Sequence, residues 1–218
     1  MKTVLYATVL LAVFGGLRLP GADPQQPTLA APAVTPVETI VFLRHGEKPE
    51  KEIGQLNCQG LNRALALPRV LISKFGRPDY LFAPAATRLT RVGGGVGDNY
   101  LRPLATIEPT AIELGMPVNA DFAYTDIDGL QAELTGQKYQ NAMIFVAWEH
   151  IKLYEFARQI LRSYGAAATP LPEWPNTDYD TIYVFHIARS SANSAPRATL
   201  DIQQEGLNKL SDNCPGPQ

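Results

Sequence analysis

The sequence predicts an α/β fold, a three-layer sandwich in which a mostly parallel central sheet has helices on both faces. Apolar, strand-like runs alternate along the chain with longer stretches in which apolar residues recur at helical spacing. The first run, ETIVFLR at 38–44, is almost continuously apolar, which is typical of a strand at the centre of a sheet. These observations favour one layered domain.

The elements follow this alternation. Helical spacing predicts a helix over 59–75, which Pro68 should kink, and DYLFAP at 79–84 reads as the second strand. The stripe of this helix consists of Leu61, Ala64, Leu65, Leu71, Ile72 and Phe75. A glycine-rich stretch separates the second strand from a helix over 102–115, which Pro103 opens, Pro109 interrupts and Gly115 ends.

The second half of the domain repeats the pattern. NAMIFVAW at 141–148 is a predicted strand, and 149–165 is a predicted helix closed by Gly165. Its apolar stripe consists of Ile151, Tyr154, Ile160, Leu161 and Tyr164. The runs at 179–188 and 197–204 favour a final strand pair joined by the polar loop RSSANSAP. Residues 117–140 show no clear period.

The N-terminus indicates export. Lys2 precedes the apolar run VLYATVLLAVFGG, which is short for a membrane span, so residues 1–22 are a predicted signal peptide with an unclear cleavage site. An uncleaved anchor is the alternative. Residues 23–37 are rich in Pro, Ala and Gln and predict an extended linker, which leaves 38–218 as the folded domain.

Composition limits the partners. The net charge is −2 and no run of Lys or Arg stands out. The sequence therefore lacks the cluster of basic residues that is typical of proteins that bind nucleic acids or anionic membranes. We expect a small polar partner and no stable membrane anchor, and the oligomeric state stays open. In an exported protein the two cysteines, Cys58 and Cys214, suggest one disulfide, although two separate thiols fit the spacing equally well.

Polar residues gather at two predicted strand ends. Arg44, His45 and Gly46 follow the first strand, and Glu149 and His150 follow the third. In open α/β sheets ligands bind at the carboxyl ends of the strands. Neutral imidazole is nucleophilic near pH 7 and guanidinium binds phosphate oxygens in pairs, so this set suits attack on a phosphoryl group.

These landmarks resemble the histidine phosphatase superfamily, which includes the phosphoglycerate mutases and related phosphatases. The signature is RHG at 44–46, and QLNCQGLNRALALP, YLFAP and MIFVAWEHIKLYEFARQIL resemble three further family segments in the expected order. The resemblance implies that His45 forms a phosphohistidine, which water hydrolyses. It also implies that Arg44, a second arginine and His150 hold the phosphate oxygens, with no metal or cofactor.

The second arginine has three candidates, Arg88, Arg91 and Arg102. In the family this arginine opens a helix and precedes a threonine by four residues, and Arg102 with Thr106 has that spacing. Pro103 fits the first turn of a helix, whose free N–H groups favour phosphate. We therefore assign Arg102 and interpret AATRLTRVGGGVGDNY as an inserted flap, with the other two arginines at the rim.

The general acid is less clear, because Glu149 stands where the family usually has a small residue. Glu149 is one candidate, and it also suits the positive end of a helix. The competitors in the middle segment are Asp121, Asp126 and Asp128. A second departure is Ala83 in place of the serine that usually precedes Pro84.

Other interpretations remain open. The three histidines permit a zinc site with bound water as nucleophile, although no close His pair is present. An exported receptor for phosphate or a phosphometabolite would need the same pocket without turnover. The position of His186 inside an alternating strand favours a packed or hydrogen-bonded role, and Glu47 and Lys48 are expected to be surface charges at the pocket mouth. A mutase is disfavoured because phosphoglycerate mutases are cytoplasmic enzymes.

Overall fold

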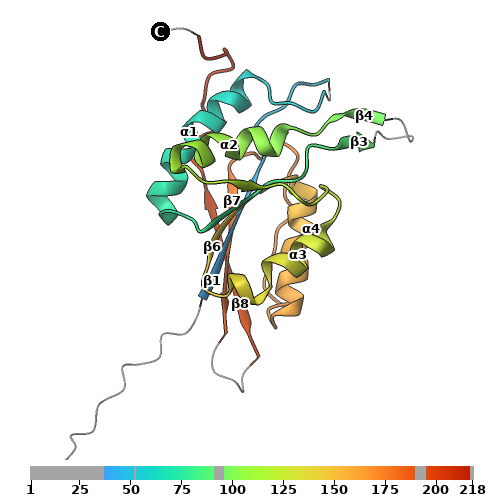
Figure 1. Ribbon diagram of the computed structural model, residues 1–218, viewed down its shortest axis with the longest axis vertical. Helices are drawn as coiled ribbons and strands as arrows, with labels where there is room; N and C mark the ends of the chain where they lie inside the picture. The colour runs from blue at the N-terminus through green and yellow to red at the C-terminus, as the bar shows by residue number, and fades with distance from the viewer. Residues whose placement is uncertain (1–36, 52, 91–95, 190–194, 217–218) are drawn as a thin grey trace, which may run out of the picture. The chain divides into compact units, whose positions relative to one another are not determined.

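The computed structural model describes residues 37–51, 53–90, 96–189 and 195–216 of the chain (Figure 1). The side chains of 88–90 and 96 are not described. The predicted signal peptide, the predicted linker apart from Val37, and Arg91 therefore lie outside the described residues.

A six-stranded sheet forms the centre of the domain, in the order β5-β2-β6-β1-β7-β8. Pairing is parallel from β5 to β1, whereas β7 runs antiparallel to both of its neighbours. The strands are β1 (Val37–Arg44), β2 (Tyr80–Phe82), β5 (Val118–Asn119), β6 (Met143–Trp148), β7 (Thr181–Ala188) and β8 (Arg197–Gln204). The predicted mostly parallel sheet and the final strand pair are confirmed.

Two helices cover each face of this sheet (Figure 1). On one face α1 (Cys58–Phe75) and α2 (Arg102–Leu114) pack against Val41 and Phe145. On the other face α3 (Ile127–Leu134) and α4 (His150–Ser163) pack against Phe42, Ile144 and Phe185. Alternate residues of each central strand therefore enter opposite cores, as a sheet buried on both faces requires. The predicted three-layer arrangement is confirmed.

The predicted interruption at Pro109 is wrong. Helix α2 runs through this residue, as α1 runs through Pro68. A proline removes only one N–H from the ladder. Ile107 and Ala111 on either side of Pro109 are buried in the core, and this packing outweighs the lost bond. The C-terminus agrees with the prediction, because Gly115 caps α2 with a φ of 61°.

The predicted helix stripes include residues that the structure exposes. Leu65 on α1 is 53% exposed and Ile151 on α4 is 52% exposed. Leu67 and Leu153 are fully buried in their place. The predicted helical period is therefore correct, but each helix turns a different side toward the sheet from the one predicted.

The middle segment contains structure that the sequence did not indicate. It holds β5, α3 and a 3₁₀ turn at Gln137–Tyr139. Helix α3 begins because the Asp126 side chain accepts a hydrogen bond from the backbone N–H of Gly129 (3.0 Å), and Leu130 and Leu134 are buried. In the predicted insertion, β3 (Arg88–Thr90) and β4 (Val96–Asn99) pair as a hairpin that projects away from the sheet (Figure 1).

The Cys58–Cys214 disulfide is present and joins residues 156 apart in sequence. Side chains near it add to the attachment of the C-terminus, because the Asn62 amide donates to the carbonyls of Ser211 and Asn213. Among the described residues, no helix has the length and apolar character needed to cross a membrane.

Reduction of this disulfide should lower the stability of the domain. Closing so long a loop restricts the unfolded chain, so we expect Cys58→Ser with Cys214→Ser to cost about 2–5 kcal/mol. Chemical denaturation with and without reductant measures this difference. Equal midpoints for the oxidised and the reduced protein would contradict the expectation.

Candidate active site

His45 lies directly beyond the end of β1, in the loop formed by residues 44–47, which we call the His45 loop. The register of β1 and β6 aligns Arg44 with Trp148, and the backbone N–H of His45 donates to the Trp148 carbonyl (3.0 Å). The strand ends that carry Arg44–His45 and Glu149–His150 are therefore adjacent. The structure brings these four residues together, as the sequence predicts.

The His45 ring is almost completely buried and has a defined tautomer. Its Nδ1 lies 2.7 Å from the Gly46 carbonyl oxygen, and because a carbonyl only accepts, Nδ1 carries the proton. Burial, with further effects from Arg102 and Arg44, lowers the pKa of His45 to about 3. At neutral pH the ring is therefore uncharged, and the lone pair is on Nε2.

Arg44 is fixed from one side only. One of its terminal nitrogens, Nη1, donates to the carbonyls of Asn176 (2.8 Å) and Asp178 (2.7 Å), and the guanidinium lies 3.8 Å from the centre of the Tyr179 ring. Arg44 is 1% exposed, yet its Nε has no hydrogen-bond partner. A buried N–H without a partner costs free energy, so this donor suits an anionic ligand.

Arg102 begins α2 and is held against the His45 loop. The Thr106 hydroxyl donates to the Arg102 carbonyl (2.8 Å) and accepts from the Gly46 N–H (2.9 Å), so the predicted four-residue spacing links helix and loop. Arg102 is 4% exposed, and both its Nε and its Nη1 lack partners. Of the other candidate arginines, Arg88 lies in β3.

Tyr100 connects His45 with Arg102. Its ring meets that of His45 edge-on, with centroids 6.0 Å apart, and the Arg102 guanidinium lies 4.9 Å from the Tyr100 ring centre. The hydroxyl is buried close to the Arg102 guanidinium, and burial outweighs the effect of Arg102 and raises the pKa of Tyr100 far above its usual value. Sequence reasoning missed Tyr100, because it lies in the inserted segment, where no local pattern indicates a functional residue.

His150 lies at the first position of α4 between two oxygen acceptors. Its Nε2 donates to the Asn176 side-chain oxygen (2.6 Å), and Glu149 Oε1 is 2.7 Å from Nδ1. The Glu149 carboxylate thus faces one ring nitrogen of His150, and Asn176 faces the other. Asn176 is a second residue that sequence reasoning missed, since it belongs to an irregular loop.

Glu149 is an ionised carboxylate in this arrangement. Its Oε2 accepts from the Lys152 N–H (2.9 Å), which makes it the N-cap of α4. Burial raises the pKa of Glu149, but the contacts with His150 and with the backbone N–H groups of Ile151 and Lys152 outweigh burial and hold the pKa at about 2.

The three aspartates proposed as alternative acids are exposed. Asp126 caps α3, and Asp128 accepts a hydrogen bond from the Gln159 side chain (3.3 Å). The backbone N–H of Asp121 donates to the Asn119 side chain (3.0 Å). None of the contacts described for these three residues involves His45, Arg44 or Arg102.

Glu47 is not at the surface, contrary to the prediction. It is 9% exposed and forms a paired contact with the buried Arg63, whose Nη2 lies 2.7 Å from Glu47 Oε1. Lys48 is half-buried. The sequence could not reveal the burial of Glu47, because its partner comes from the next helix.

His186 lies far from the other two histidines. It pairs with Thr39 across β1 and β7, and its Nδ1 lies 3.1 Å from the Thr39 hydroxyl. Thr39 precedes His45 by six residues of extended chain, which is about 20 Å. The predicted hydrogen-bonded role of His186 is confirmed, and the three-histidine arrangement is wrong. Within the described ranges, no group of three or more His, Cys, Asp or Glu side chains is placed to hold a metal ion.

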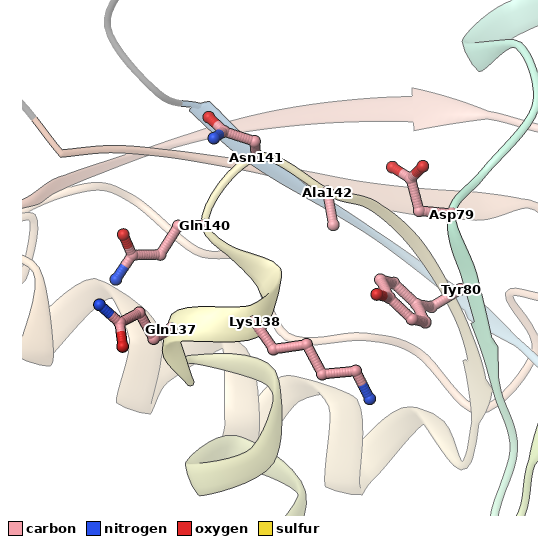
Figure 2. A pocket seen from close by; sticks show the side chains of 7 residues that line it. All are labelled: Asp79, Tyr80, Gln137, Lys138, Gln140, Asn141 and Ala142. Atoms are coloured by element: carbon pink, nitrogen blue, oxygen red, sulfur yellow. The ribbon is translucent and has the colours of Figure 1, made fainter.

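A separate pocket of about 310 Å³ lies at the opposite end of the sheet (Figure 2). It is bordered by Asp79 and Ala142, which directly precede β2 and β6, and Figure 2 shows Lys138 extending toward Tyr80. The Lys138 ammonium lies 5.1 Å from the Tyr80 ring centre. No sequence-predicted site residue lines this pocket, so it is distinct from the His45 site.

Solved structures share the fold. A mycobacterial glucosyl-3-phosphoglycerate phosphatase in complex with inorganic phosphate aligns with 75% of this chain and 95% of its own, at 14% identity and a TM-score of 0.50. The native form of that phosphatase aligns with 76% and 97%, at 14% identity and a TM-score of 0.50. A phosphoserine phosphatase from Entamoeba histolytica aligns with 77% and 98%, at 12% identity and a TM-score of 0.45.

No family model matches the sequence, and no curated protein matches it. At an identity of 14% the structural likeness shows the fold alone, so the chemistry depends on the residues described above.

Proposed function

We propose that this protein is an exported phosphatase of the histidine phosphatase superfamily, which hydrolyses a phosphomonoester through a phosphohistidine on His45. One observation carries the proposal: an uncharged histidine is surrounded by buried N–H donors that have no protein partner. These donors are Arg44 Nε together with Arg102 Nε and Nη1. Fixed positive donors around a nucleophile are what phosphoryl transfer requires.

The first step would form a bond between His45 Nε2 and phosphorus while the bond from phosphorus to the alcohol oxygen breaks. The Gly46 carbonyl supports this step, because it keeps the proton on Nδ1 and holds the ring in place. In the second step a water oxygen attacks phosphorus, the Glu149–His150 pair takes a proton from this water in place of the one given to the alcohol, and the bond to His45 Nε2 breaks. Phosphate leaves, and His45 returns to its neutral form.

The two arginines would hold the equatorial oxygens of the phosphoryl group. Arg44 is held by backbone carbonyls on one side. The Thr106 link holds the backbone of Arg102 beside the His45 loop, and the Arg102 guanidinium lies against the Tyr100 ring. Donors fixed before the substrate arrives need no reorganisation as negative charge develops. Tyr100 supplies a further buried hydroxyl beside His45 and Arg102.

The proton for the leaving alcohol is proposed to come through the Glu149–His150 pair. A carboxyl group with a pKa of about 2 does not hold a proton at neutral pH, which argues against Glu149 as the direct donor. Glu149 Oε1 lies 2.7 Å from His150 Nδ1 and orients the ring, whose Nε2–H points to the Asn176 side-chain oxygen. When substrate binds, this N–H would exchange the Asn176 oxygen for the phosphoryl group, and the Glu149–His150 pair would release its proton to the leaving oxygen.

Export is supported by the apolar N-terminal run and by the Cys58–Cys214 disulfide, since such bonds persist in oxidising compartments. The net charge of −2 and the inward-facing arginines fit a small phosphorylated substrate.

Activity should survive a chelator. The groups that stabilise the phosphoryl oxygens are the side chains of arginine and histidine, so we expect hydrolysis of a generic aryl phosphate to be unchanged by EDTA. Activity that is lost in EDTA and restored by zinc would contradict the proposal and favour a metal-dependent hydrolase. Tight binding of inorganic phosphate without turnover of any monoester would favour a receptor.

A further inference from the structure

Arg63 on α1 is fully buried in a cluster of three carboxylates. Its Nε and Nη2 donate to both oxygens of Glu47, at 2.9 and 2.7 Å. On the other side, Nη1 lies 2.5 Å from Glu205 Oε2 and 3.3 Å from Asp180 Oδ1. One side chain therefore joins the His45 loop, the residue that precedes β7, and the residue that follows β8.

The contact with Glu47 is part of a tight junction between the His45 loop and α1. A Cβ atom on Gly60 would lie 2.3 Å from the Glu47 carbonyl oxygen, and one on Gly46 would lie 2.9 Å from the Gly60 oxygen. The Glu47 carbonyl also accepts from the Asn57 N–H (3.0 Å). The backbone beside His45 thus rests directly on the first turns of α1, and the Arg63–Glu47 pair closes the junction.

The opposite side of the cluster holds the C-terminal segment, residues 205–214. Asp180 accepts from the backbone N–H groups of Gly206 (3.1 Å) and Leu207 (2.7 Å), which orients the start of this segment. Its far end is joined to α1 by Cys58–Cys214. Asp180 also directly follows Tyr179, whose ring lies against Arg44.

The cluster carries more carboxylates than one guanidinium can neutralise. Glu205 is 4% exposed and its Oε1 has no partner, and burial raises the pKa of Glu205 to about 8. The charged groups that face it are Arg63, Glu47 and Asp180, while Arg69, Lys74 and Glu113 line the adjoining pocket of about 640 Å³. At neutral pH Glu205 is therefore mainly protonated.

We propose that Arg63 is a positioning residue for His45: it fixes the His45 loop through Glu47 and couples that loop, through Asp180 and Glu205, to the disulfide-held C-terminal segment. This inference rests on the proposed phosphatase function. Arg63 touches none of the groups assigned to the phosphoryl oxygens, so it acts only through the loop. Losing it would let the loop shift, and misplacement by about 1 Å costs about 10²-fold in rate.

The test compares Arg63→Met with Arg189→Met. Arg189 is the matched control, because this half-buried arginine pairs with the buried Glu38 (2.6 Å) near the opposite end of β1. Both variants should lose stability, but at a temperature where both are folded only Arg63→Met should lower kcat, by about 10²-fold with little change in KM. Glu47→Gln retains side-chain volume, and it should reproduce the loss if Arg63→Met does not fold. Equal kcat values for all variants would overturn the proposal.

The pH profile provides a second readout that a purely structural role would not move. The pKa of Glu205 in the folded protein lies above its ordinary value. The contribution of protonated Glu205 to the free energy of unfolding is therefore complete at low pH and is lost as pH rises through about 8. Ionisation adds an uncompensated negative charge beside Glu47. We therefore expect kcat of the native protein to fall above this pH, and Glu205→Gln to retain activity there. If kcat of the native protein and kcat of Glu205→Gln fell at the same alkaline pH, the proposed coupling would be contradicted.

Amide hydrogen exchange separates this inference from the proposed function. The N–H groups of Gly46 and Asn57 should exchange faster in Arg63→Met than in Arg189→Met, whether or not the protein turns over any phosphomonoester. Unchanged exchange at both positions would refute the positioning role. Absence of turnover in the native protein would instead refute the phosphatase proposal.

Discussion

Replacing Arg102 with alanine is expected to lower kcat/KM by about 10³-fold or more, at low and at high ionic strength. Arg102 is 4% exposed and presents two nitrogens that lack protein partners beside His45. A buried positive donor is weakly screened by salt, so its loss cannot be compensated by ions. Steady-state kinetics with an aryl phosphate at two salt concentrations measures the effect.

Arg88→Ala is the control for that result. Arg88 lies in the projecting β3–β4 hairpin, and we predict that it contributes a rim charge that attracts anionic substrate. Its replacement should reduce kcat/KM modestly at low salt and leave it unchanged at high salt. A loss at high salt that equals the loss from Arg102→Ala would contradict the assignment of the second arginine and the insertion that it implies.

Replacing His45 with alanine should abolish turnover, since the proposed covalent step has no other nucleophile. The two site arginines keep their own contacts with the Asn176 and Asp178 carbonyls and with Thr106. Inorganic phosphate should therefore still bind. Turnover assays and phosphate titration of the same sample test both expectations, and circular dichroism checks the fold.

His186→Ala is the matched control, because His186 contacts Thr39 at the other end of the sheet. It should retain full activity. If the His45 variant kept appreciable turnover, or if the His186 variant lost it, the proposed roles of the two histidines would be wrong.

The parts of the fold that local sequence determines were predictable. The apolar runs before Arg44 and Glu149 predicted two central strands, which the structure contains, and their polar ends indicated the candidate site. Arg102 was assigned because the family resemblance places this arginine four residues before a threonine, and in the structure the Thr106 hydroxyl bridges helix and loop. Such signals lie within a few residues of one another.

The missed features depend on contacts between distant segments. Glu47 is charged and follows a loop glycine, and only its pairing with Arg63 explains its burial. Asn176 and Tyr100 come from irregular segments whose positions no local period predicts. Helix α3 was missed because it has only eight residues, too few to establish a helical period in the sequence. In each case tertiary packing supplies what local propensity lacks.

Trapping of the covalent intermediate tests the central claim most directly. The native protein is mixed with an aryl phosphate and quenched rapidly under alkaline conditions, and its peptides are analysed by mass spectrometry. The account predicts phosphate on the peptide that contains His45, in an amount that decays at the rate of turnover and is absent from His45→Ala. Turnover at a normal rate with no phosphate on that peptide at any quench time would contradict it.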